Sequence, residues 1–128
     1  IGILCISILL VSAIASSFLD NIPFVAAMIP LLTRISMSLF PDTGGLSPEA
    51  YHVYLISHSM PLWWSLALGS CLGGNGTIIG ASANVVIAGF SEKTRSPLNF
   101  GNYFRYGFPL MLFSVVIAGI YIALRYLR

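Results

Sequence analysis

Apolar residues fill four long stretches of the chain, and short polar segments separate them. The first two stretches cover residues 1–19 and 24–40, with Asp20-Asn21-Ile22-Pro23 between them. Proline cannot continue a preceding helix, but it suits the first turn of the next one. The pattern therefore predicts a helical hairpin over residues 1–40, with its tip at 20–23.

The rest of the chain is predicted to form a loop, a broken helix and a last helix. Prolines, glycines and acidic residues interrupt the apolar pattern over 41–60, which predicts a polar loop. Within it, Ser47-Pro48-Glu49 is typical of the start of a short interfacial helix. Residues 61–91 are apolar at both ends but carry glycines and small polar residues in the middle, so we expect a helix that is broken there. A polar connection at 92–105 then leads to a last apolar helix at 106–128.

Composition places these helices in a membrane. The chain is 57% hydrophobic and 8% charged, with a mean hydropathy of +0.90, whereas a soluble domain carries about 25% charged residues. Because about 20 apolar residues cross a bilayer, we expect an all-α integral membrane domain. The chain begins at Ile1 inside an apolar stretch, so we expect it to be a segment of a longer membrane protein. Its net charge of +2 gives no reason to expect a nucleic-acid partner.

Basic residues predict the orientation of this domain. Arg125 and Arg128 flank one face, and the 92–105 connection on the other face carries three basic residues, Lys93, Arg95 and Arg105. Cytoplasmic connections of membrane proteins carry an excess of Lys and Arg. We therefore expect residues 92–105 to be cytoplasmic and the protein to lie in the plasma (inner) membrane.

The location of the hairpin tip decides what Asp20 can do. If both arms span the membrane, the tip lies in water and Asp20 and Asn21 only cap the second helix. If the hairpin is re-entrant, the tip lies inside the membrane, where an ionisable residue must be paired, protonated or bound to a cation. Each arm is about 25 Å long at 1.5 Å per residue, so arm length leaves both arrangements open.

Glycines in the middle of the broken segment have two explanations that the spacing leaves open. They form two pairs with a spacing of four, Gly69 with Gly73 and Gly76 with Gly80. Such pairs let membrane helices approach closely. Alternatively they interrupt the helix, so that its exposed ends and the side chains of Asn75, Thr77, Ser82 and Asn84 can bind a substrate or an ion. The spacing fits neither a dinucleotide fingerprint nor a phosphate loop.

No pattern in the sequence predicts an enzyme or a resident cofactor. His52 and His58 are six residues apart and match no zinc signature. Cys5 and Cys71 lie far apart inside apolar stretches, which is typical of small buried side chains. No nucleophile lies next to a recognisable base. We therefore expect neither a metal site built from these residues nor enzymatic activity.

Two segments make the chain recognisable. Residues 17–30 read Ser-Phe-Leu-Asp-Asn-Ile-Pro-Phe-Val-Ala-Ala-Met-Ile-Pro, and residues 68–86 read Leu-Gly-Ser-Cys-Leu-Gly-Gly-Asn-Gly-Thr-Ile-Ile-Gly-Ala-Ser-Ala-Asn-Val-Val. In this order they closely resemble the C-terminal half of the P-protein/arsenical-pump (ArsB-like) permease family. That family belongs to the ion transporter superfamily, together with citrate and dicarboxylate carriers. The resemblance covers essentially the whole chain.

The resemblance implies a transporter of two inverted repeats, each with a re-entrant hairpin and a discontinuous transmembrane helix. This chain would form the second repeat. Asp20-Asn21-Ile22 would lie at the hairpin tip, where dicarboxylate carriers typically have Ser-Asn-Thr. Residues 80–84 would form the break, where relatives often have a Gly-Ser-Pro-Pro-Asn-like sequence, so the missing prolines leave the extent of unwinding open. The aspartate adds a group that can bind H⁺ or Na⁺ and release it.

The resulting hypothesis is a cation-coupled secondary transporter, driven by H⁺ or Na⁺, that moves arsenite, antimonite or another small anion. A Na⁺/H⁺ antiporter of the same superfamily and a non-transporting membrane assembly subunit are the alternatives. Expected partners are the N-terminal half of the same transporter, the lipid bilayer and a small inorganic ion, with a homodimer as an option. The candidate site residues are Asp20, Asn21, Gly74, Asn75, Thr77, Ser82 and Asn84, of which Asp20, Asn75 and Asn84 would hold Na⁺.

Overall fold

The computed structural model describes residues 1–42 and 44–126, and every regular element in these ranges is a helix. The all-α prediction is therefore confirmed for the described residues. In chain order the elements are α1 (Gly2–Ser16), α2 (Asn21–Leu39), α3 (Pro48–Gly73), the 3₁₀ turn η1 (Ile78–Gly80), α4 (Ser82–Ser91) and α5 (Phe100–Tyr126).

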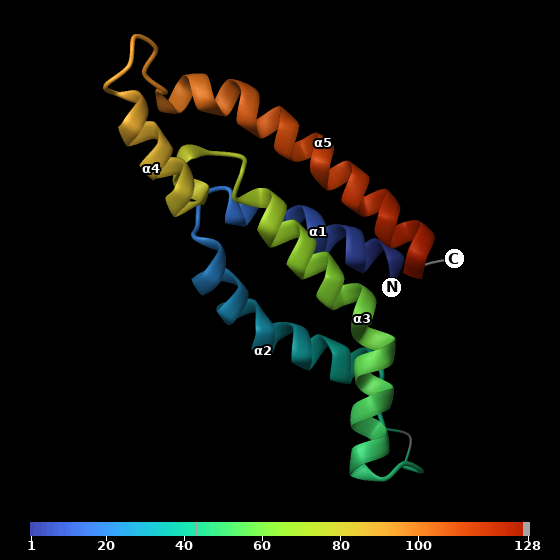
Figure 1. Ribbon diagram of the computed structural model, residues 1–128. Coiled ribbons are helices and arrows are strands. Elements are labelled where there is room, and N and C mark those ends of the chain that lie inside the picture. The colour runs from blue at the N-terminus through green and yellow to red at the C-terminus, as the bar shows by residue number, and fades with distance from the viewer. Residues whose placement is uncertain (43, 127–128) are drawn as a thin grey trace.

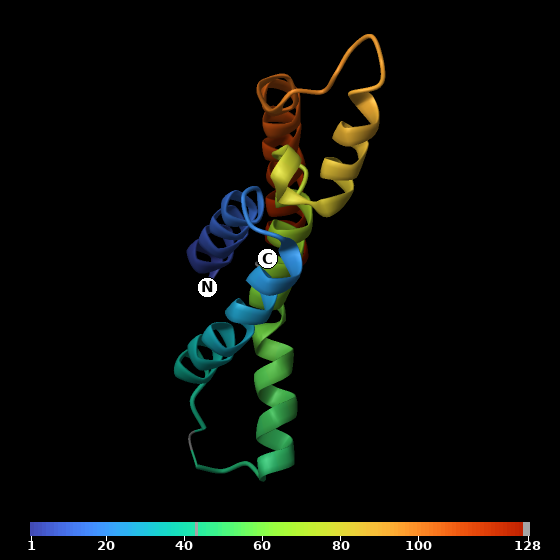
Figure 2. The same ribbon diagram turned by 90° about the vertical axis from the view of Figure 1, so that its left-hand side faces the viewer.

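The helices α1 and α2 are the two arms of a hairpin, and residues 17–20 form its tip (Figure 1). The expected tip at 20–23 is wrong, because α2 already begins at Asn21, directly after Asp20. The N-terminus lies near the end of α5, and the connection between α4 and α5 lies at the opposite end of the molecule (Figure 1). The hairpin tip lies alongside α5 rather than beyond either of its ends, in both views (Figure 2). The break between α3 and α4 lies at the same level as the tip. The tip, where the chain reverses, and the break, after which α4 continues in the general direction of α3, therefore meet within the length of α5 (Figures 1 and 2).

Helices α1, α3 and α5 build most of the core, and α2 adds two fully buried residues, Leu32 and Ser36. The close approach of α1 and α3 depends on two glycines. A Cβ atom at Gly69 would lie 2.5 Å from the carbonyl oxygen of Leu9, and one at Gly73 would collide with the backbone of Ala13. The packing interpretation is thus confirmed for this pair. The largest fully buried core side chains are Leu9, Leu32, Leu62, Met111, Val115 and Ile122.

The expected polar loop at 41–60 is wrong in its second part, because α3 begins at Pro48. The Ser47 hydroxyl accepts a hydrogen bond from the N–H of Ala50 (3.3 Å). Pro48 occupies the first turn, where a backbone N–H has no partner within the helix, so the lack of an N–H in proline costs no hydrogen bond. Pro61 then lies inside the helix, which is bent (Figure 1). The connection between α2 and α3 is correspondingly short, and Thr43 within it lies outside the described residues.

The last helix also begins earlier than predicted, at Phe100 instead of residue 106. Phe100, Phe104 and Phe108 stack along one side of its first turns, with ring centroids 6.1 and 4.8 Å apart. Such i, i+4 aromatic contacts stabilise a helix in a segment whose polarity suggested a loop. Residues 127 and 128 of the predicted helix lie outside the described residues.

Within residues 1–42 and 44–126, two helices are long and apolar enough to cross a membrane: α2 with 19 residues and α5 with 27. Only a small part of each is buried within the chain. Their apolar surfaces are therefore available to lipid or to further protein.

Candidate functional site

Hydroxyl groups hold the hairpin tip on the break between α3 and α4. The Ser16 hydroxyl donates to the carbonyl oxygen of Ser70 (2.7 Å), and the Ser17 hydroxyl donates to that of Gly73 (2.9 Å). In return, the Thr77 hydroxyl donates to the carbonyl oxygen of Ser17. Ser16, Ser17 and Thr77 are fully buried. The carbonyls of Ser70 and Gly73 also accept the backbone N–H groups of Gly74 and Gly76, so the two serine hydroxyls give each of them a second donor. Such bonds from side chains satisfy carbonyl groups at helix ends.

The second glycine pair lies in this junction and not in a helix interface. A Cβ atom at Gly76 would lie 2.6 Å from the Ser17 hydroxyl oxygen. One at Gly80 would lie 2.8 Å from the carbonyl oxygens of both Ser17 and Gly74. Two irregular segments thus approach each other so closely that neither position has room for a side chain.

Asn84 ties the beginning of α4 to the loop before it. Its Nδ2 donates to the carbonyl oxygens of Gly74 (2.9 Å) and Thr77 (3.0 Å), across the break. The Thr77 hydroxyl also accepts the N–H of Gly80 (3.1 Å). Both amide hydrogens of Asn84 are used in this way, and its Oδ1 has no hydrogen-bond partner among the described residues. Asn84 therefore fixes the conformation of the loop between α3 and α4, and its Oδ1 remains able to accept a hydrogen bond or to bind a cation.

Two helix N-termini meet at the junction. Asp20 precedes α2 and Ala81 precedes α4, and neither helix has a side-chain cap hydrogen bond at this end. The beginnings of α2 and α4 lie beside each other in both views (Figures 1 and 2). Ser82, the first residue of α4, is exposed. Uncapped N-termini carry free N–H groups and a partial positive charge, which favour an anion.

Asp20 and Asn21 lie at the edge of the junction, and both have free oxygen atoms. The Asp20 side chain is exposed in the described chain and makes no cap hydrogen bond. The Nδ2 of Asn21 lies 3.8 Å from the sulfur of Cys71, whereas its Oδ1 is buried and has no partner among the described residues. An unpaired buried acceptor costs about 1–3 kcal/mol. This oxygen is therefore a position where a cation or a donor group would be stabilised.

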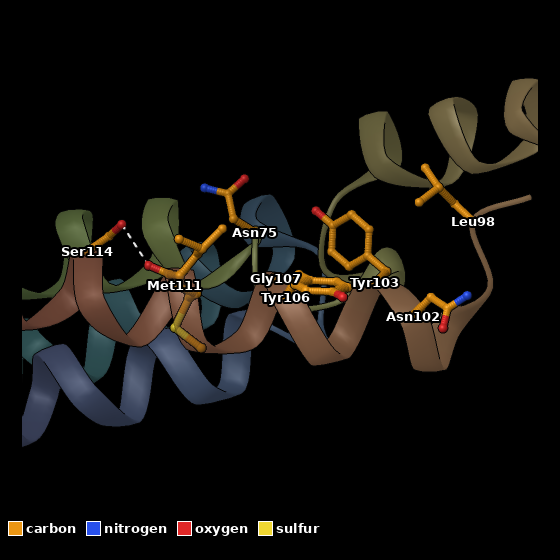
Figure 3. Close-up of a pocket in the computed structure, with 9 residues that line it drawn as sticks. Asn75, Leu98, Asn102, Tyr103, Tyr106, Gly107, Met111 and Ser114 are labelled. Carbon is orange, nitrogen blue, oxygen red and sulfur yellow. Dashed lines mark hydrogen bonds between the residues drawn. The ribbon is translucent and has the colours of Figure 1, made fainter. Parts of the chain in front are cut away.

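Asn75 lies apart from the other predicted site residues. Its side chain lines a cavity of about 380 Å³ beside α5, together with Tyr103 and Tyr106 (Figure 3). Its backbone rests on Gly107, where a Cβ atom would lie 3.0 Å from the Asn75 carbonyl oxygen. The structure thus gathers Asp20, Asn21, Gly74, Thr77, Ser82 and Asn84 around the junction, but it turns Asn75 toward α5.

Ser16 and Ser17 also belong to the junction, although they are not among the site residues predicted from the sequence. The available signal was their position at the end of the first arm, three and four residues before Asp20. Among residues 1–42 and 44–126, no group of three His, Cys, Asp or Glu side chains could hold a metal ion.

Neither a family profile nor a solved structure matches the chain. Curated proteins do. The chain is 46% identical to the P protein of Mus musculus over 117 residues, which cover 91% of the chain and 12% of that protein. It is 41% identical to a 46 kDa membrane protein of Mycobacterium leprae over 117 residues (91% of the chain, 24% of the relative). It is 38% identical to an uncharacterized transporter of Synechocystis over 112 residues (84% and 24%).

The two apolar helices and the names of these relatives indicate that the chain is part of a membrane protein. Within that class, the resemblance to the P-protein/arsenical-pump family is confirmed by the P proteins and the bacterial relatives, which match the chain with the C-terminal part of larger proteins. The chain spans 12% to 24% of the length of these relatives.

Proposed function

We propose that the chain supplies part of the ion-coupled transport site of a secondary transporter, driven by H⁺ or Na⁺. The observation that carries the proposal is the docking of the hairpin tip, with Asp20, on the break between α3 and α4. Relatives named as transporters support it. Broken helices whose ends face a polar site are typical of secondary transporters.

The hairpin tip packs beside the middle of α5 and not beside one of its ends, and this position favours a re-entrant hairpin. A Cβ atom at Gly76 would touch both the Ser17 hydroxyl and, at 3.0 Å, the Cε of Met111. Met111 is the twelfth of the 27 residues of α5, about 17 Å from the start of that helix at 1.5 Å per residue. If α5 spans a hydrocarbon core about 30 Å thick, the tip lies near its middle. Irregular backbone at this depth is stable only inside protein or beside a wet cavity.

The residues around the junction then divide into two roles. Asp20 is the coupling group, and the free amide oxygens of Asn21 and Asn84 are further ligands for a cation. Ser82 and the free N–H groups of α2 and α4 face an anion. Gly74 and Thr77 hold the loop in place, because the Thr77 hydroxyl is already bound to Ser17 and Gly80.

The transported solute in this proposal is arsenite, antimonite or another small anion. A Na⁺/H⁺ antiporter is the second candidate, because the unpaired Oδ1 of Asn21 next to a carboxylate offers the oxygen ligands that a hard cation prefers. A purely structural role for the glycines explains Gly69 and Gly73 but not this unpaired oxygen. In this proposal the N-terminal half of the transporter completes the site. The protein lies in the plasma membrane, with residues 92–105 on the cytoplasmic side. The exposed apolar faces of the helices are compatible with a homodimer.

The test uses everted membrane vesicles that contain the full-length parent, with an acid interior and a fluorescent pH reporter. Na⁺, Li⁺, arsenite and small anions are added in turn to the wild type, to Asp20→Asn and to the matched control Asp42→Asn. We expect one solute to collapse the gradient in the wild type and the control, and at least tenfold more slowly in Asp20→Asn. Equal rates in all three proteins would contradict the role of Asp20.

A further inference from the structure

The cavity of about 380 Å³ that Asn75 lines extends along the first half of α5. Its lining begins at Leu98, just before this helix, and reaches Met111 and Ser114 near the middle of it. The side chain of Asn75 comes from the break between α3 and α4 (Figure 3). The cavity therefore lies between the end of the molecule that carries residues 92–105 and the level of the hairpin tip.

Polar groups along this cavity are not used within the chain. Amides and phenols line it, and they belong to Asn75, Asn102, Tyr103 and Tyr106. Figure 3 marks a hydrogen bond from the Ser114 hydroxyl to the carbonyl oxygen of Leu110 (2.9 Å), but none between these amides and phenols. Their side chains have no hydrogen-bond partner elsewhere in the part of the chain that the structure describes. They are therefore free to bind water or a solute.

Asn75 lies too deep for its amide to face lipid. A Cβ atom at Gly107 would lie 3.0 Å from the carbonyl oxygen of Asn75, and Gly107 precedes Met111 by about 6 Å along the helix at 1.5 Å per residue. In the proposed re-entrant arrangement, Met111 lies near the middle of the membrane. The Asn75 side chain is exposed in the described chain, and an unpaired amide is costly in hydrocarbon. Because unpaired polar groups continue from Asn75 to Asn102 at the start of α5, water can reach this amide from that end.

We propose that the cavity is a water-filled vestibule, through which a small polar solute reaches the break from the face of residues 92–105, with Asn75 as its first contact at the inner end. The inference rests on the proposed transport function, from which it takes the depth of Met111. None of the nine residues that line the cavity carries a charge. The lining therefore favours the protonated, uncharged form of a small oxyacid, which can donate and accept hydrogen bonds.

Single cysteines test whether the cavity contains water. Leu110→Cys and Phe113→Cys are made separately in a cysteine-free full-length parent, and a small charged thiosulfonate is applied to right-side-out and to everted vesicles. Both positions are 65% exposed and lie within about 3 Å of the level of Met111 along the helix, but of the two only Leu110 lines the cavity. We expect Leu110→Cys to react at least tenfold faster than Phe113→Cys, from the same face as Lys93→Cys.

Three results of this labelling would overturn the proposal. Slow reaction at both positions would mean that lipid or another part of the parent fills the cavity. Fast reaction at both would mean that the middle of α5 is surrounded by water. Reaction of Leu110→Cys only from the face opposite to Lys93→Cys would place the opening at the other end.

Uptake of arsenite, which is largely the uncharged acid at neutral pH, tests whether the vestibule is the path of the solute. Modification of Leu110→Cys should slow uptake at least tenfold, a reducing agent should restore it, and modification of Lys93→Cys should leave it unchanged. Full modification of Leu110→Cys without loss of uptake would overturn the path, whereas the result for Asp20→Asn in the pH assay would stand. No uptake in the wild type would overturn the uncharged oxyacid as the solute.

Asn75→Leu tests the inner contact, because leucine has a similar size but cannot form hydrogen bonds. If Asn75 binds the entering solute, the arsenite concentration for half-maximal uptake should rise at least fivefold, with little change in the maximal rate. An unchanged concentration would overturn the role of Asn75.

Discussion

Gly69 and Gly73 have the same spacing as Gly76 and Gly80, yet the two pairs lie in different kinds of structure. The first pair lies inside α3 and allows the backbone of α1 to approach it. The second pair lies in the break, against the hairpin tip. The first pair fixes how two helices pack, and the second fixes how two irregular segments dock. Spacing alone therefore does not reveal the role of a glycine in a membrane helix.

The largest difference between the pairs should appear in stability. Gly73→Ala places a Cβ atom against the Ala13 backbone, which cannot rotate away. We expect a loss of about 3 kcal/mol and little folded protein in a detergent extract of the full-length parent, measured by size-exclusion chromatography. A yield equal to that of the wild type would mean that α1 and α3 are further apart than described here.

A substitution in the second pair should act on the junction and leave the helices folded. A Cβ atom at Gly76 meets the side chains of Ser17 and Met111, which can move, so we expect Gly76→Ala to cost about 2 kcal/mol and to abolish transport.

The double variant Gly76→Ala with Ser17→Ala supplies the control for this contact. Removing the Ser17 hydroxyl should reduce the effect of Gly76→Ala by about 1 kcal/mol in a double-mutant cycle of thermal unfolding. Strict additivity would show that Ser17 and Gly76 do not touch.

The Thr77 hydroxyl should matter for the same docking, with a smaller effect. Thr77→Val leaves the buried carbonyl of Ser17 without the hydroxyl that donates to it, which costs about 1–3 kcal/mol. The N–H of Gly80 keeps its bond to the backbone carbonyl of Thr77 (3.3 Å). Thr77→Ser should restore most of the stability. The control is Thr33→Val, because the Thr33 hydroxyl donates only to the carbonyl oxygen of Ile29 in its own helix. The melting temperature of this variant should stay near that of the wild type.

The smallest effect is expected at Gly89, where a Cβ atom would meet nothing within 4 Å. Gly89 lies inside α4, and replacing a mid-helix glycine by alanine stabilises a helix by roughly 0.5–1 kcal/mol. Gly89→Ala should therefore raise the melting temperature slightly and leave transport unchanged. A clear loss of stability would indicate that another part of the parent packs closely on α4.

The apolar pattern predicted the hairpin and the position of the break, because both follow from prolines, glycines and polar residues that interrupt apolar stretches. Ser47-Pro48-Glu49 indicated the start of a helix, but the pattern failed to predict that this helix continues to Gly73, because Pro61 bends α3 without ending it. Nor did it predict that Asn75 lines the cavity beside α5. In an irregular loop, tertiary contacts such as that with Gly107 decide where a side chain points, and no periodicity encodes them.

The central claim is that the hairpin tip lies inside the membrane, docked on the break, and labelling of single cysteines tests it most directly. Asp20→Cys and Lys93→Cys are introduced separately into a cysteine-free full-length parent, and a bulky membrane-impermeant maleimide is applied to each face of intact vesicles. A docked re-entrant tip predicts rapid labelling of Lys93→Cys from one face and labelling of Asp20→Cys at least tenfold more slowly from either face. Equal rates at both positions from the same face would show that both arms span the membrane and that the tip lies in water.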